Sequence, residues 1–231
     1  ATFTLDDVAI VTLAPELPGA LPLIRSLVEQ DVVVSIGHSD ATAVEARAAL
    51  DAGATLGTHL LNAMPPISAR EPGIAGVLLA DPRCRFSMIV DGHHHDPDVI
   101  RMTWNAADER FVVITDAIAA AGMPDGHYRI GSVGVTVDAG AARNADGRLA
   151  GATATMETSL VNLIEITGTT LASALRSVTS TPARVLGRTD IGGLDHGMRG
   201  DVTLLANGSV AATIVGGNLA FLRDPERLTP R

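Results

Sequence analysis

The chain has 231 residues, of which 46% are hydrophobic and 19% charged, and its formal net charge is -9 at pH 7. This composition excludes a disordered chain and supplies enough apolar side chains for one large domain, or for a domain with an appendage. The negative charge, with no run of Lys and Arg, argues against nucleic acid or an anionic membrane as a partner, whereas a small anionic substrate needs only a few basic side chains in a pocket.

Cysteine usage and the first residues bear on the cellular compartment. Cys84 is the single cysteine, so an intrachain disulfide is excluded. Residues 1–8 contain neither a basic region nor a long apolar run, and no apolar stretch approaches the ~18 residues that a membrane span needs. We therefore expect a cytoplasmic protein. The first residue is Ala rather than Met, which suggests processing or truncation.

Five short apolar runs are expected to form strands, and each stops at a residue that can bind a metal or transfer a proton. In chain order these are residues 8–14 before Glu16, 32–37 before His38, 54–58 before His59, 86–90 before Asp91 and 111–115 before Asp116. Apolar residues at helical spacing occupy 18–30, 41–52 and 98–108. Alternating strands and helices predict βα units and a parallel sheet.

The rhythm changes after Asp116. Residues 122–151 contain seven glycines and 128–137 alternate as a strand does, so we expect a β-hairpin insertion at about 122–150. Helical patterns return at 155–166 and 171–180. Short strands at 202–205 and 211–215 flank the turn Asn207-Gly208, a strong hairpin signal. The chain is thus divided into a part with strand–helix alternation and the hairpin insertion, 1–188, and a small β-sandwich portion, 189–231.

The strand-end residues are expected to meet. In a parallel α/β barrel all strand C-termini open onto one mouth, so His38, His59 and Asp116 would converge. Two imidazoles and a carboxylate suit a divalent metal and its activated water, which predicts a metal-dependent hydrolase. Taken singly, each histidine is more often structural, and Asp116 has an alternative as a helix N-cap. Eight strands close such a barrel, so five strands predict an incomplete (β/α)8 TIM-type barrel.

Eight segments, in order from about residue 10 to the end, resemble the N-acetylglucosamine-6-phosphate deacetylases of the amidohydrolase superfamily. They are TLAPELPG (12–19), GHSDA (37–41), THLLNAMPP (58–66), REPG (70–73), DGHHHDP (91–97), VITDA (113–117), LAG (149–151) and TPARVLG (181–187). The resemblance implies a metal-bearing (β/α)8 barrel with a small β-sandwich domain, of which this chain is similar to the C-terminal two-thirds, about strands 4 to 8. It also implies a homodimer.

The same resemblance implies roles for individual residues. His38 and His59 match the metal-binding imidazoles, and Asp116 matches the catalytic aspartate. The positions that match substrate contacts are Asn62, Ala63, Arg70, Asp91, Gly92, His93, His94, Leu149, Ala150 and Gly151, with Arg70 and His94 on phosphate. The implied cofactor is a divalent metal, zinc foremost, with iron and manganese as alternatives, and the implied substrate is N-acetylglucosamine 6-phosphate. Arg70 has the alternative of an ordinary surface arginine.

One departure stands out. Family members carry a His-Leu-Glu-Gly-Pro motif whose glutamate is the third protein ligand, and this sequence does not contain it. Glu16 is a poor substitute and is better interpreted as a strand-end carboxylate paired with a neighbour. The run His93-His94-His95 cannot supply three ligands, because consecutive loop residues point in different directions. His127 and His196 are expected to face solvent, and Cys84 has no expected catalytic role.

Three functions therefore remain open. The first is deacetylation of N-acetylglucosamine 6-phosphate. The second is a non-catalytic fragment, at most a sugar-phosphate binder, because the third ligand is missing. The third is an amidohydrolase that acts on another N-acyl or cyclic amide substrate.

Overall fold

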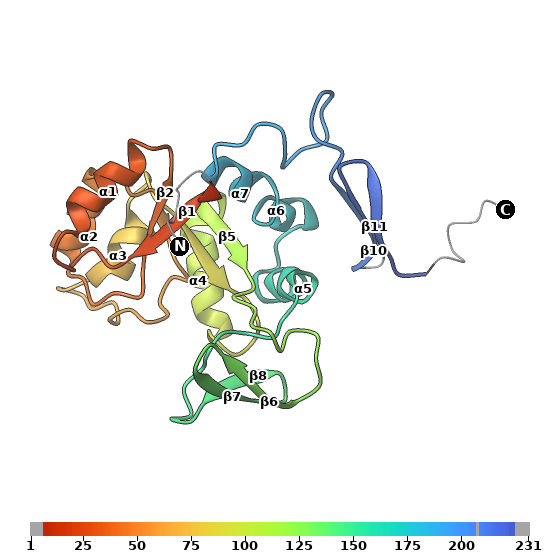
Figure 1. Ribbon diagram of the computed structural model, residues 1–231, viewed down its shortest axis with the longest axis horizontal. Helices are drawn as coiled ribbons and strands as arrows, with labels where there is room; N and C mark the ends of the chain where they lie inside the picture. The colour runs from red at the N-terminus through yellow and green to blue at the C-terminus, as the bar shows by residue number, and fades with distance from the viewer. Residues whose placement is uncertain (1–6, 207, 225–231) are drawn as a thin grey trace.

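The structure is a computed structural model that describes residues 7–206 and 208–224. Outside the described residues lie most of the N-terminal segment 1–8, Asn207 of the expected turn, and the end of the 189–231 portion. Figure 1 gives the arrangement of the elements along the chain.

A five-stranded parallel sheet forms the centre of the fold, in the order β1-β2-β3-β4-β5. The strands are β1 (Ile10–Leu13), β2 (Val33–Ile36), β3 (Leu56–Gly57), β4 (Arg85–Ile89) and β5 (Phe111–Ile114). The helices that connect them are α1 (Ala20–Val28), α2 (Ala43–Asp51), α3 (Gly73–Ala80) and α4 (Pro97–Ala107), the last followed by a 3-10 turn, η2 (Asp108–Arg110). The parallel sheet predicted from the strand–helix alternation is confirmed.

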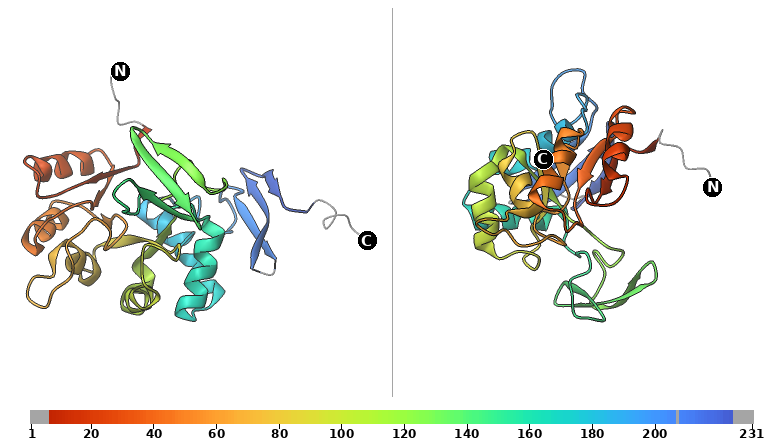
Figure 2. Two further views of the ribbon diagram at one scale, coloured as in Figure 1. Left: turned by 90° about the horizontal axis from the view of Figure 1, so that it is seen from below. Right: turned by 90° about the vertical axis from the view of Figure 1, so that its left-hand side faces the viewer.

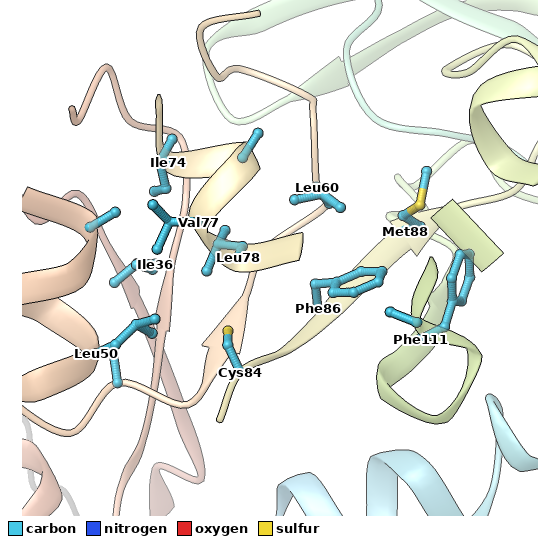
Figure 3. Packing of buried hydrophobic residues seen from close by; sticks show 14 of the residues in the cluster. Ile36, Leu50, Leu60, Ile74, Val77, Leu78, Cys84, Phe86, Met88 and Phe111 are labelled. Atoms are coloured by element: carbon cyan, nitrogen blue, oxygen red, sulfur yellow. The ribbon is translucent and has the colours of Figure 1, made fainter. Parts of the chain in front are cut away.

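Alternate strand residues bury their side chains against the helices. Val34 and Ile36 of β2, together with Phe86 and Met88 of β4, belong to the main hydrophobic cluster with residues of the helices. Figure 3 shows this packing, including Leu78 from α3 beside the strands. Strand neighbours i and i+2 lie on one face of a sheet, so Ser35 and Ser87 take the opposite face. The cluster is mostly aliphatic, and its aromatic members are Phe86, Trp104 and Phe111.

Local sequence signals explain where the helices begin. Thr42 caps α2 and forms a reciprocal capping box with Glu45. Asp96 caps α4, and Pro97 occupies its first turn, where a missing N–H costs nothing. These caps start each helix shortly after a strand has ended, which leaves the intervening loop at the carboxyl edge of the sheet.

The second half of the chain adds three helices and two antiparallel sheets. The helices are α5 (Met156–Thr167), α6 (Leu171–Arg176) and α7 (Ser180–Val185). One sheet contains β6 (Gly126–Ile130), β7 (Val133–Asp138) and β8 (Ala141–Asn144), and the other β9 (Val202–Ala206), β10 (Ser209–Val215) and β11 (Asn218–Leu222). Each has one strand more than the hairpin expected from sequence. The two sheets lie apart from each other beside the parallel sheet and its helices (Figures 1 and 2).

Within the described part of the chain, no helix has the length and apolar character required to cross a membrane.

Candidate active site

His38, His59 and Asp116 follow the carboxyl ends of β2, β3 and β5, and the structure brings the two histidines into contact. Their ring centroids are 4.7 Å apart and the ring planes meet at 76°. His59 is 5% exposed, whereas His38 is exposed. Burial lowers the pKa of His59, the neighbouring His38 lowers it further, and the carboxylate of Asp116 opposes the shift. His38 and Asp116 therefore both lie within electrostatic reach of the His59 imidazole.

The backbone at all three residues has an uncommon conformation. The angle φ is +50° at His38, +32° at His59 and +51° at Asp116. It is also positive at Leu61 (+72°) and Ala63 (+48°), in the turn after His59. Residues other than glycine rarely adopt a positive φ, and they do so at a cost that surrounding contacts must offset.

Buried contacts hold the turn at His59. Its main-chain N–H donates to the Oγ atom of Ser87 at 2.8 Å, and the Ser87 hydroxyl donates to the carbonyl of Gly57 at 3.2 Å. The main-chain N–H of Leu60 donates to the carbonyl of Ser87 at 2.8 Å. Ser87, a buried serine on β4, thus hydrogen-bonds both to Gly57 at the end of β3 and to His59 just beyond it.

A carboxylate on the first strand end holds the loop that carries His38. Glu16 accepts hydrogen bonds from the Ser39 hydroxyl at 2.6 Å and from the Asp40 main-chain N–H at 2.9 Å. The Ser39 N–H donates to the carbonyl of Ala63 at 3.0 Å, which joins the loops after β2 and β3. Glu16 is therefore a paired strand-end carboxylate, the interpretation preferred from sequence.

The turn at Leu149, Ala150 and Gly151 lies beside Asp116. The N–H of Ala152 donates to the carbonyl of Asp116 at 2.8 Å, and the N–H of Ile118 donates to the carbonyl of Ala152 at 3.0 Å. Gly151 has φ +67°, and a Cβ atom there would overlap the Cγ2 atom of Ile118 and lie 3.1 Å from the carbonyl oxygen of Asp116. Only glycine allows the two backbone segments to lie this close, so the turn at 149–151 supports the backbone at Asp116.

The loop after β4 is organised around Asp91. Its carboxylate accepts hydrogen bonds from the His94 Nδ1–H group, with 2.7 Å between the heavy atoms, and from the main-chain N–H groups of His93 and His94, at 2.9 Å each. Both side chains of the pair are buried, with 3% of Asp91 and 6% of His94 exposed. Burial alone would raise the pKa of Asp91, but the hydrogen bonds from His94 and His93 outweigh it and hold that pKa well below its usual range. Gly92 provides the positive φ, +85°, that the turn requires.

The sequence-based interpretation gave His95 no role, yet the structure places it against Asn62. The Asn62 Nδ2 and His95 Nε2 atoms are 2.9 Å apart, and Nδ2 also donates to the carbonyl of His59 at 3.4 Å. Arg70 is exposed in the connection between β3 and α3, and it makes no hydrogen bond or ion pair with the described residues.

The donor set at the histidine pair fits a divalent metal in part. The Nδ1 atom of His59 is buried and has no hydrogen-bond partner among residues 7–206 and 208–224, and a neutral imidazole nitrogen in that state is a suitable metal ligand. The described residues contain no group of three or more His, Cys, Asp or Glu side chains placed to hold a metal ion. Among the described residues, His38 and His59 are therefore the pair whose ring nitrogens could hold a metal, and two nitrogens alone would leave its coordination incomplete.

Comparisons with known proteins show which family this chain resembles over most of its length. The amidohydrolase family profile matches residues 6–220. The N-acetylgalactosamine-6-phosphate deacetylase of Escherichia coli O157:H7 is 44% identical over 200 residues, which are 86% of this chain and 53% of that protein. The N-acetylglucosamine-6-phosphate deacetylase of Homo sapiens is 39% identical over an alignment of 231 residues, covering 96% of this chain and 56% of that protein.

A solved structure has a similar fold over most of this chain. It is an alanine variant of the N-acetyl-D-glucosamine-6-phosphate deacetylase from Mycobacterium smegmatis in complex with N-acetyl-D-glucosamine-6-phosphate, and it superposes with a TM-score of 0.88 at 44% identity. The match covers 92% of this chain and 57% of that one. The chain thus spans little more than half the length of the proteins it matches.

Proposed function

This chain belongs to the amidohydrolase family, and on that premise we propose that it hydrolyses the N-acetyl group of N-acetylglucosamine 6-phosphate. The products are acetate and glucosamine 6-phosphate. The observation that carries the proposal is the meeting of two strand-end imidazoles within electrostatic reach of a strand-end carboxylate, His38, His59 and Asp116.

His38 and His59 are the residues of this chain that would hold a divalent metal. When bound, such a metal supplies a Lewis acid that lowers the pKa of a water and polarises the amide carbonyl. We propose zinc, because imidazole is among its preferred ligands; iron and manganese share that preference. Burial keeps the His59 imidazole neutral, which is the form that can donate a lone pair to the metal.

Asp116 moves the proton. Its carboxylate accepts a proton from the attacking water and then delivers it to the nitrogen of the departing amine. A C–O bond first forms to the acetyl carbon, and the C–N bond then breaks as the nitrogen is protonated, so one water is consumed for each acetate released. The remaining expected contacts surround this centre: Arg70 and His94 for phosphate, Asn62, Ala63 and the 91–94 loop for the sugar, and the 149–151 turn beside Asp116.

Replacing Asp116 with Asn tests the assignment. Asparagine tolerates the positive φ at this position, so the backbone should be retained while the proton acceptor is lost. We expect metal content to be unchanged and turnover to be abolished. Asp98→Asn, on the exposed face of α4, is the matched control and should leave turnover unchanged. Near-normal activity of the Asp116→Asn variant would refute the role.

The principal alternative keeps the same reaction but changes the substrate to N-acetylgalactosamine 6-phosphate. The two sugars differ in the configuration of the hydroxyl group at C4. The Escherichia coli O157:H7 relative is named for the galactosamine substrate, whereas the human relative is named for the glucosamine substrate. Turnover measured with both 6-phosphates, and with N-acetylglucosamine lacking phosphate, separates the three possibilities. A phosphate requirement supports Arg70 and His94 as its ligands.

A non-catalytic role is the competing function, because the described residues supply two metal ligands. Metal analysis of the purified protein distinguishes the two. About one tightly held zinc or iron per chain supports a working site. A typical zinc site has four ligands, so tight binding would mean that the two imidazoles are not the metal's only ligands. A metal-free protein supports a sugar-phosphate binder.

The architecture and setting follow from the same premise. We propose that β1 to β5 are five consecutive strands, the fourth to eighth, of a (β/α)8 barrel spanning 1–188, with β9 to β11 as part of a β-sandwich. We also propose a homodimer, which light scattering would test. The proposed substrate is a charged metabolite that membranes retain, so the reaction belongs in the cytoplasm.

A further inference from the structure

We propose that His95 is a positioning residue that orients the Asn62 side-chain amide, so that Asn62 meets a hydrogen-bond donor of the sugar rather than an oxygen of the phosphate. This inference rests on the proposed function, which places Asn62 at the substrate. His95 itself acts through Asn62.

Two acceptors fix which end of the Asn62 amide is nitrogen. The His59 carbonyl lies 3.4 Å from Nδ2 and can only accept, and the His95 Nε2 atom lies 2.9 Å from the same atom. An amide turned the other way would place its oxygen against the His59 carbonyl oxygen, with no hydrogen to share. His95 Nε2 must therefore be the unprotonated nitrogen, and Nδ1 carries the proton.

The surroundings of His95 favour this neutral form. Burial, reinforced by the nearby His94, lowers the pKa of His95 to about 4. Its ring is thus an acceptor at neutral pH and is available to Asn62 without competition from a proton. The adjacent His94 pairs with Asp91 instead, so the two rings have separate partners.

The orientation decides what Asn62 can bind. Both Nδ2 hydrogens are engaged, and no described residue hydrogen-bonds the Oδ1 atom. The side chain therefore offers a free acceptor. Hydroxyl and N–H groups of an acetamido sugar can donate to it, whereas the oxygens of a phosphate dianion cannot. Without His95, only the long hydrogen bond to the His59 carbonyl, at 3.4 Å, holds the amide in this orientation, so the discrimination is weakened.

Kinetics of three variants test the role. His95→Leu has a similar size but no acceptor, and we expect KM for N-acetylglucosamine 6-phosphate to rise about tenfold with kcat changed less than about twofold, because orientation is a ground-state contribution. His95→Gln restores an acceptor and should return KM to within about threefold of the wild type. His196→Gln, on the exposed tail, is the control and should match the wild type.

A double-mutant cycle separates positioning from simple destabilisation. If His95 acts through Asn62, His95→Leu should have no further effect on KM in an Asn62→Ala background. An unchanged KM in His95→Leu, or the same increase in both backgrounds, overturns the proposal.

A second measurement does not depend on activity. In ¹⁵N-labelled wild-type protein, the His95 ring should show an unprotonated, hydrogen-bonded Nε2 and a protonated Nδ1. Protonation at Nε2 overturns the inference. Absence of turnover in the wild type would instead refute the proposed function, and the ring-nitrogen spectrum would still decide whether His95 holds the Asn62 amide.

Discussion

Replacing Ser87 with Ala should loosen the turn that presents His59. The Ser87 hydroxyl accepts from the His59 N–H at 2.8 Å and donates to the Gly57 carbonyl at 3.2 Å, and the serine is almost fully buried. Alanine removes both hydrogen bonds and introduces no replacement partner. The His59 N–H would then remain buried without an acceptor.

The size of the effect follows from that orphaned donor. A buried polar group left unsatisfied costs about 1–3 kcal/mol, and a net loss of ~2 kcal/mol lowers Tm by roughly 4–8 °C in a chain of this length. Because the hydroxyl also fixes the backbone of a candidate metal ligand, affinity for zinc should fall by about 10–100-fold.

Ser159 provides a matched control. It is also fully buried, but its hydroxyl has no hydrogen-bond partner among the described residues. Ser159→Ala therefore removes the same atom without orphaning a donor, and its free energy of unfolding should be unchanged or slightly higher. Urea denaturation and zinc titration of both variants give the comparison. If the two substitutions changed the free energy of unfolding by amounts within about 0.5 kcal/mol of each other, the reasoning would be refuted. Differences of that size are ordinary for substitutions that break no buried hydrogen bond.

Three further predictions concern the same region and the core. Gly151→Ala should destabilise the protein and reduce turnover, because the new methyl group collides with Ile118 beside Asp116; Gly147→Ala, at φ +76° with no atom within 4 Å, measures the backbone term alone, and equal losses would contradict the steric explanation. Burial raises the pKa of Cys84 to about 12, so at pH 8 only about one thiol in ten thousand is ionised and a thiol reagent should label native protein at the unfolding rate; rapid native labelling would contradict this. The lowered pKa of Asp91 means that its stabilising contribution is present above the unfolded pKa of about 3.9 and is lost as the pH falls through the lower folded value, so the stability difference between wild type and Asp91→Asn should shrink below about pH 4 in urea denaturation. A constant difference down to pH 2.5 would contradict it.

The parallel sheet could be predicted because its strands are short apolar runs that end at polar residues, and alternation with helices leaves few topologies. Helix α3 escaped prediction for a physical reason. Its sequence GIAGVLLA is apolar on every side and is buried at Gly73, Ile74, Ala75, Val77 and Leu78, so no polar face gives it a helical period. Strands β8 and β11 were missed because they are short and the alternation that marks a strand is weak in them, with four of the five residues of β11 exposed.

The candidate site divides in the same way. Convergence of His38 and His59 could be inferred because strand direction alone places the carboxyl ends at one edge. The partner of His95 could not, since neither periodicity nor strand order determines where a loop side chain points. The support that Ser87 gives to His59 also depends on register between neighbouring strands, in which Gly57 pairs with Phe86, and the sequence contains no signal for that register.

The left-handed backbone at residues 38, 59 and 116 has an evolutionary consequence. Glycine or asparagine would adopt the positive φ at each of these positions with less strain, so replacing these residues should raise thermal stability and abolish the proposed activity. In a library of variants selected only for the folded state at high temperature, substitutions at these three positions should therefore be among the first to appear. Only selection for turnover would keep the original side chains.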